Sequence, residues 1–121
     1  PRDQDIGNVV SNTFVNKAAA EFSGAVGISV GYTANTSIVH CDVHNATYGA
    51  ISVGWGWSRK PLTYARDTLI AYNRVHDYKQ TLNDGGGIYM LGPQNGSKIH
   101  DNYVYHQGTA SSGAARAAKR R

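Results

Sequence analysis

The sequence predicts an all-β chain, a right-handed parallel β-helix (solenoid) of about three and a half coils. Two series of short apolar segments carry this prediction, because they alternate along the chain without exception. Segments of the first series read apolar-x-x-Asn-x-apolar and start at residues 9, 38, 70 and 99, which are 29, 32 and 29 residues apart. The second series comprises Gly27–Gly31, Ala50–Gly54 and Gly87–Met90. Such a period is typical of a solenoid, whose coils bury a continuous core only against their neighbours.

Each segment of the first series predicts two very short strands joined by a bend. Asn suits a bend because it tolerates left-handed backbone angles and its amide bonds nearby backbone. Stacked coils would place Asn12, Asn73 and Asn102 in one ladder, interrupted by Cys41. The alignment also predicts three inward columns of apolar residues: Val9, Ile38, Ile70 and Ile99; Phe14, Val43, Val75 and Val104; and Ile28, Ile51 and Ile88. The apolar residues do not recur at the i, i+3, i+4, i+7 spacing of an amphipathic helix. Only Lys17–Phe22 is expected to form one helical turn.

The coils are expected to occupy residues 1–107, and a basic low-complexity tail residues 108–121. Of the 12 Lys and Arg residues, four lie in the last six positions, and the remaining eight balance eight acidic residues. A nucleic-acid-binding face needs basic residues spread over a folded surface, so no nucleic acid is expected as a partner. No apolar run approaches the roughly 20 residues of a membrane helix, so no membrane partner is expected either.

Three stretches resemble a known family. Gly49–Trp57 reads GAISVGWGW, Asn83–Pro93 reads NDGGGIYMLGP, and Gly24–Tyr32 looks like the preceding coil. They resemble bacterial right-handed parallel β-helix repeat proteins of the pectin-lyase-like superfold, and the chain is similar to glycoside hydrolase family 141-type proteins. The resemblance implies a secreted or periplasmic, carbohydrate-active parent that acts on a polysaccharide or oligosaccharide. Since neither end shows the cap that a solenoid needs, the chain is expected to be a fragment, inactive alone, that stacks on the remaining coils of its parent.

Three acidic residues are candidates for the pair of carboxylates that hydrolyses a glycosidic bond. The two carboxyl groups stand about 5–5.5 Å apart in retaining enzymes and about 6.5–9.5 Å apart in inverting ones. Adjacent coils are about 4.8 Å apart, so acids one or two coils apart on one face meet either requirement. Asp84 precedes three glycines at the entry to a strand, Glu21 lies in the corresponding loop two coils earlier, and Asp77 follows a bend. The alternatives are a turn hydrogen bond for Asp84, a solvated loop position for Glu21, and a ladder hydrogen bond or an exposed turn for Asp77.

Five side chains are candidates for substrate binding, because sugar rings stack on flat aromatic faces and their hydroxyls bond polar tips. Trp55 and Trp57 alternate with glycines at a strand end, whereas Tyr32, Tyr89 and His76 lie near the predicted face. The alternative is that the rings cover the edge of a coil. His44 and His76 share a register and should stack on the outer wall, but a metal site needs three or four ligands. We therefore expect neither a metal nor another cofactor.

Two other functions remain open on the same scaffold. A polysaccharide lyase or uronate epimerase needs a base together with Arg, Lys or calcium to neutralise a substrate carboxylate, and only Arg66, Arg74 and Lys79 are near the predicted face. A non-catalytic solenoid for polysaccharide binding or adhesion predicts aromatic residues without paired acids. The distance from Asp84 to Glu21 or Asp77 discriminates between hydrolysis and binding.

Overall fold

The computed structural model describes residues 3–56 and 64–108 and confirms a right-handed parallel β-helix. Its strands are three to five residues long: β1 (Val9–Ser11), β2 (Phe14–Asn16), β3 (Ile28–Val30), β4 (Ser37–Val39), β5 (Asp42–His44), β6 (Ile51–Val53), β7 (Leu69–Ala71), β8 (Arg74–Tyr78), β9 (Ile88–Met90), β10 (Lys98–His100) and β11 (Tyr103–Gln107). The described part of the chain holds no helix, and therefore none long and apolar enough to cross a membrane.

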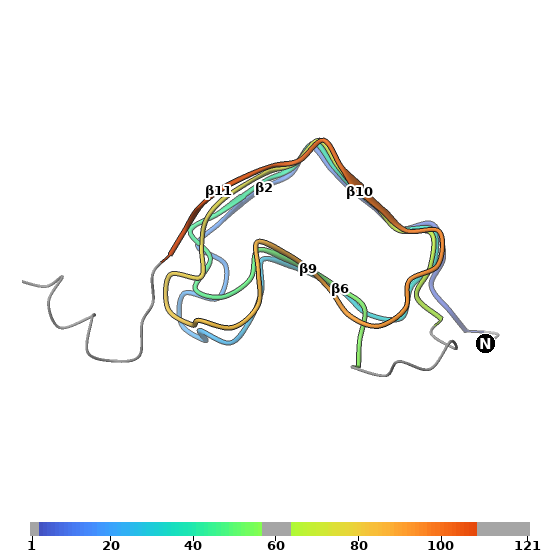
Figure 1. Cartoon of the computed structure of the whole chain (residues 1–121), viewed down its shortest axis with the longest axis horizontal. Coiled ribbons are helices and arrows are strands. Elements are labelled where there is room, and N and C mark those ends of the chain that lie inside the picture. Colours follow the sequence, from blue (N-terminus) through green and yellow to red (C-terminus); the bar gives the residue numbers. More distant parts are fainter. Residues whose placement is uncertain (1–2, 57–63, 109–121) are drawn as a thin grey trace, which may run out of the picture.

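The strands form three sheets in which every pairing is parallel. Their orders are β1-β4-β7-β10, β11-β8-β5-β2 and β3-β6-β9. The coils overlay one another in Figure 1, where β2 and β11 meet β10 at a sharp corner and β6 and β9 form a separate wall. Each of the first three coils therefore contributes one strand to each wall, whereas the fourth contributes β10 and β11 to two of them within the described residues.

Left-handed residues turn the chain at the same places in successive coils. One column of positive φ angles comprises Asn12, His40, Tyr72 and Asp101, and a second comprises Lys17, Asn45, Asp77 and His106. Left-handed backbone is sterically uncommon for residues other than Gly, Asn and Asp. Tyr and Lys occupy such positions here because the parallel pairing on both sides of each corner fixes the local direction of the chain.

The first coil is shifted by one residue from the predicted alignment. Val10, not Val9, pairs with Ile38, and Val15, not Phe14, pairs with Val43. Val9 and Phe14 are both 66% exposed. The prediction was wrong because this coil has two adjacent apolar residues in each strand, and a shift of one residue turns a side chain to the opposite face.

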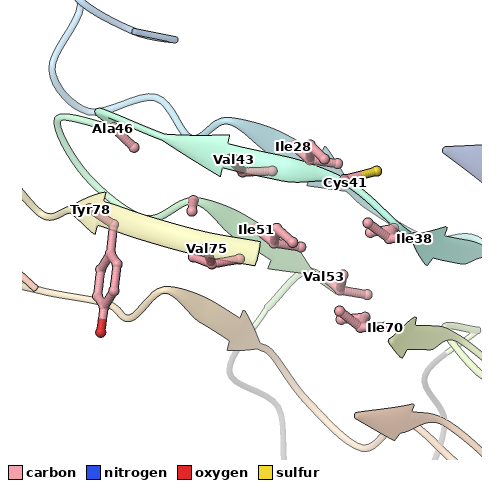
Figure 2. Close-up of a cluster of buried hydrophobic side chains, with 11 residues drawn as sticks. Ile28, Ile38, Cys41, Val43, Ala46, Ile51, Val53, Ile70, Val75 and Tyr78 are labelled. Carbon is pink, nitrogen blue, oxygen red and sulfur yellow. The ribbon is translucent and has the colours of Figure 1, made fainter. Parts of the chain in front are cut away.

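The core lies between the three walls (Figure 2). Ile38, Ile70, Val43, Val75 and Ile51 are fully buried, and Figure 2 shows them in the inward-facing cluster. Ile99 and Val104 continue two of the predicted columns but are 48% and 40% exposed. Burial thus depends on having a coil on both sides, as a stacked solenoid requires.

An asparagine ladder runs inside the corner between the first two sheets. Asn73 Nδ2 donates to the Ile38 carbonyl at 2.9 Å, and Asn102 Nδ2 donates to the Ile70 carbonyl at 2.8 Å. Asn73 Oδ1 accepts from the Cys41 amide at 2.9 Å. The ladder was predicted, but Asn12 is not part of it: the shifted register places Asn12 at the left-handed corner, one residue earlier.

Asn73→Ala is expected to lower the free energy of unfolding by about 2–4 kcal/mol. Asn73 is 2% exposed, so its loss leaves a buried amide of Cys41 and a buried carbonyl of Ile38 without these partners, at about 1–3 kcal/mol each. Urea unfolding of the two proteins measures the difference. Asn45→Gly is the control, because Asn45 is exposed, its side chain donates to the side chain of Asn16, and glycine tolerates the left-handed backbone at this position. Equal losses for the two variants would contradict the ladder.

The loops that lead into β3, β6 and β9 stack like the strands. The Thr47 hydroxyl lies 3.1 Å from the Ala19 carbonyl oxygen and 3.2 Å from the Ser23 carbonyl oxygen, which share its one proton. The Lys79 amide donates to the Tyr48 carbonyl. The expected helical turn over residues 17–22 is wrong, because Lys17 and Ala19 are left-handed and the segment forms bends and turns instead. Apart from Gly108, the predicted basic tail lies outside the described residues.

Candidate functional site

A hollow of about 360 Å³ lies on the outer face of the β3-β6-β9 wall. In each of the three strands the outer residues of the triplet face the core, so the middle residue faces outward. These middle residues are Ser29, Ser52 and Tyr89, and they pair in register across the coils. Two serine hydroxyls and one phenol therefore form the floor of the hollow.

Trp55 forms one side of the hollow and is 66% exposed. Its position follows from Gly54, which comes directly after β6 and has a φ of +92°. This angle interrupts the extended backbone, so the chain leaves the strand direction before Trp55. A Cβ on Gly54 would collide with the Leu91 carbonyl and the Gln94 side chain, so only glycine fits there. Trp57, the neighbouring candidate, lies outside the described residues.

Asp84 forms the opposite side, in the loop before β9. Its Oδ1 accepts from the Gly85 amide at 2.8 Å, and its Oδ2 accepts from the Tyr48 hydroxyl at 3.2 Å. Burial, and then the hydrogen bond to Asp84, raises the pKa of Tyr48 above its ordinary value, so the phenol stays a donor. The turn hydrogen bond expected as an alternative role for Asp84 is present, and the carboxylate is still exposed.

The structure does not bring the other two candidate acids into this hollow. Glu21 is exposed in the loop between β2 and β3, and Asp77 lies on β8 in a different sheet. All eight acidic residues of the chain belong to its described parts, and Asp84 is the one that lines the hollow there. Neither Glu21 nor Asp77 lines the hollow together with Asp84, so a catalytic pair of Asp84 with either acid stays a prediction.

The candidate binding residues divide in the same way. Trp55 and Tyr89 line the hollow, whereas Tyr32 lines a second depression with Asp5 and Tyr64. His76 lies beside Asp77, on the outer face of the β11-β8-β5-β2 wall. The sequence analysis did not predict Tyr48 as a lining residue. The available signal was its position directly before the Gly49–Trp57 stretch.

A second polar cluster surrounds His76. Its Nδ1 is 2.7 Å from Asp77 Oδ2, and its Nε2 is 3.2 Å from Asp42 Oδ1. Asp42 Oδ1 is also 3.0 Å from His44 Nδ1. The hydrogen bond from His76 lowers the pKa of Asp77 below its ordinary value, against a smaller opposite effect of burial. As predicted, His44 and His76 stack, with ring centroids 4.5 Å apart.

Comparison with solved structures supplies one relevant likeness. The fold matches a chain titled "Glycoside hydrolase" with a TM-score of 0.73 and 27% sequence identity, over 85% of this chain. The chain is a β-helix similar to that glycoside hydrolase. It spans 18% of the length of the matched protein. No family model and no curated protein matches the sequence. Fold and moderate identity together therefore show a β-helix that is similar to a glycoside hydrolase.

Proposed function

We propose that the hollow on the β3-β6-β9 wall binds a polysaccharide and that Asp84 acts there as one carboxylate of a hydrolytic pair. The observation that carries the proposal is the convergence of Trp55, Tyr89 and Asp84 on one hollow of a glycoside-hydrolase-like β-helix. An exposed indole offers a flat apolar face to a sugar ring, and serine hydroxyls on the floor can exchange hydrogen bonds with sugar hydroxyls.

Asp84 suits the chemistry because hydrogen bonds fix its carboxylate while the side chain remains accessible to a substrate. The Gly85 amide and the Tyr48 hydroxyl fix both carboxylate oxygens, while the side chain stays exposed to the hollow. Hydrolysis needs a second carboxyl group within about 5–9.5 Å. Since no other acid of the chain lines the hollow in its described parts, the proposal assigns that partner to further coils of the parent protein.

Non-catalytic polysaccharide binding is the second candidate, and the single carboxylate favours it. A lyase or epimerase is less well supported, because no Lys, Arg or His is among the described residues that line the hollow. Binding is common to the first two candidates, so binding and hydrolysis are tested separately.

Trp55→Ala is expected to weaken polysaccharide binding by about 2- to 12-fold, because stacking on an aromatic ring contributes about 0.5–1.5 kcal/mol beyond buried area. Affinity electrophoresis of the chain in gels containing a panel of neutral and acidic polysaccharides measures the change. Tyr103→Ala is the matched control, since Tyr103 is also 66% exposed but lies on β11, on another wall. Equal weakening by both substitutions, or retardation by no polysaccharide, would contradict binding at the hollow.

A further inference from the structure

We propose that Asp42, His44 and His76 form a binding site for a divalent first-row transition metal ion, for which Zn²⁺ is the probe. The site lies on the outer face of the β11-β8-β5-β2 wall, away from the residues assigned to carbohydrate. It shares no lining residue with the hollow, so the two assignments can fail independently.

The parallel register creates the cluster. Asp42 and His44 are two residues apart on β5, so both face outward while Val43 between them is fully buried. His44 pairs in register with His76 on β8 of the next coil. The three donors therefore come from two adjacent coils, and the side chains are only 12–28% exposed.

The distances suit a small tetrahedral ion. Zn–N and Zn–O bonds of about 2.0–2.2 Å at a tetrahedral angle place neighbouring ligand atoms about 3.3 Å apart. Asp42 Oδ1 already lies 3.0 Å from His44 Nδ1 and 3.2 Å from His76 Nε2. The three donor atoms are all within 4.8 Å of one another. Because a nitrogen lone pair lies in the ring plane, binding also requires the two stacked imidazoles to tilt toward the shared ion.

The surroundings of His76 supply an independent indication. Its Nδ1 is held by Asp77 at 2.7 Å, which leaves Nε2 to face Asp42 and His44. A carboxylate on the far nitrogen is the usual outer partner of a metal-binding histidine, because it fixes the tautomer and strengthens the ligand. The ring of Tyr105 stacks on the other face of His76, with centroids 4.9 Å apart, and limits its rotation.

The neighbouring basic side chains do not occupy the ligand atoms that would face the ion. Arg74 is 3.7 Å from Asp42 Oδ2, the oxygen that does not face the histidines, and its guanidinium also bonds the Tyr105 hydroxyl. His106 is 3.7 Å from Asp77. Two imidazoles and one carboxylate favour Zn²⁺, Co²⁺, Ni²⁺ or Cu²⁺ over Mg²⁺ and Ca²⁺, which prefer oxygen ligands alone. With three protein ligands, one position remains for water.

Isothermal titration of the untagged 121-residue chain with Zn²⁺ tests the site. We expect one ion per chain with a Kd of about 1 μM or tighter, and a loss of at least about 10-fold in affinity for His44→Ala and for His76→Ala. Asp77→Asn should weaken binding by about 10-fold through His76. If an alanine variant does not fold, His44→Phe keeps the ring and removes the ligand.

His100→Ala is the matched control, because His100 forms a comparable pair with Asp101 at 2.8 Å on a neighbouring sheet, and no second histidine among the described residues completes a three-ligand group there. Its Zn²⁺ affinity should equal that of the wild type. The absence of Zn²⁺ binding, or an equal loss in the His44 and His100 variants, would overturn the proposal. With Co²⁺, intense visible absorption of a four-coordinate ion that disappears in His44→Ala would support it, and the weak absorption of a hydrated six-coordinate ion would oppose it.

Discussion

Asp84→Asn is expected to lower the rate of polysaccharide hydrolysis by at least about 100-fold in the full-length protein that contains this chain. Asparagine has nearly the same shape and its Oδ1 can still accept the hydrogen bond from Gly85 or Tyr48, but it can neither ionise nor donate a carboxyl proton. Removal of a positioned acid or base costs about 10²–10⁴-fold in rate. Release of reducing ends from the polysaccharide that binds best measures the effect.

The control for this experiment is Asp101→Asn. Asp101 is an exposed acid paired with a histidine on a different wall, so its replacement should leave the rate unchanged. A wild-type protein that binds the polysaccharide but hydrolyses none of the panel would reject the catalytic role and retain the binding one. Full activity in Asp84→Asn would remove Asp84 from the reaction.

Ile70→Ala is expected to lower the free energy of unfolding by about 3–4 kcal/mol, whereas Ile99→Ala should cost about 1–2 kcal/mol. The two residues have the same type and adjacent places in one column, but Ile70 is fully buried between coils and Ile99 is 48% exposed. A buried Ile→Ala substitution costs about 2–5 kcal/mol in lost transfer energy and residual cavity. Urea unfolding followed by circular dichroism gives both values.

Should Ile70→Ala unfold the chain altogether, Ile70→Val keeps the comparison with Ile99→Val measurable, at about 0.5–1.5 kcal/mol for the buried site. The buried residue should again lose more. Equal costs at the two positions would mean that neighbouring coils do not supply the burial on which this solenoid depends.

The fold was predictable because the same pattern of apolar residues recurs in successive coils. Three coils agree on the inward positions of Ile38, Ile70 and Val43, and the structure confirms them. The first coil was misaligned because Val9 and Val10 are equally apolar, and only backbone pairing decides which of them faces inward. The left-handed corners were also misplaced by one residue, because the asparagine of the ladder satisfies buried backbone while its predecessor makes the turn.

The site was predictable only in part. Trp55 and Asp84 carry a signal in the sequence, since each adjoins glycines at the end or entry of a strand. Which wall an acid faces depends on the length of the loop before it, so Asp77 could not be separated from Asp84 by pattern alone. Asp42 was overlooked as a neighbour of the two histidines, although its alternation with His44 on one strand indicates a shared face.

Tryptophan fluorescence tests the central claim most directly, because the chain has only two tryptophans and Trp55 lines the hollow. The measurement is a titration of Trp57→Phe, in which Trp55 is the sole reporter, with oligosaccharides from the polysaccharides in the panel. Carbohydrate binding at the hollow predicts a saturable change in emission that Tyr89→Ala weakens and Tyr103→Ala leaves intact. Unchanged emission with every oligosaccharide, while the polysaccharides still bind elsewhere on the chain, would contradict it.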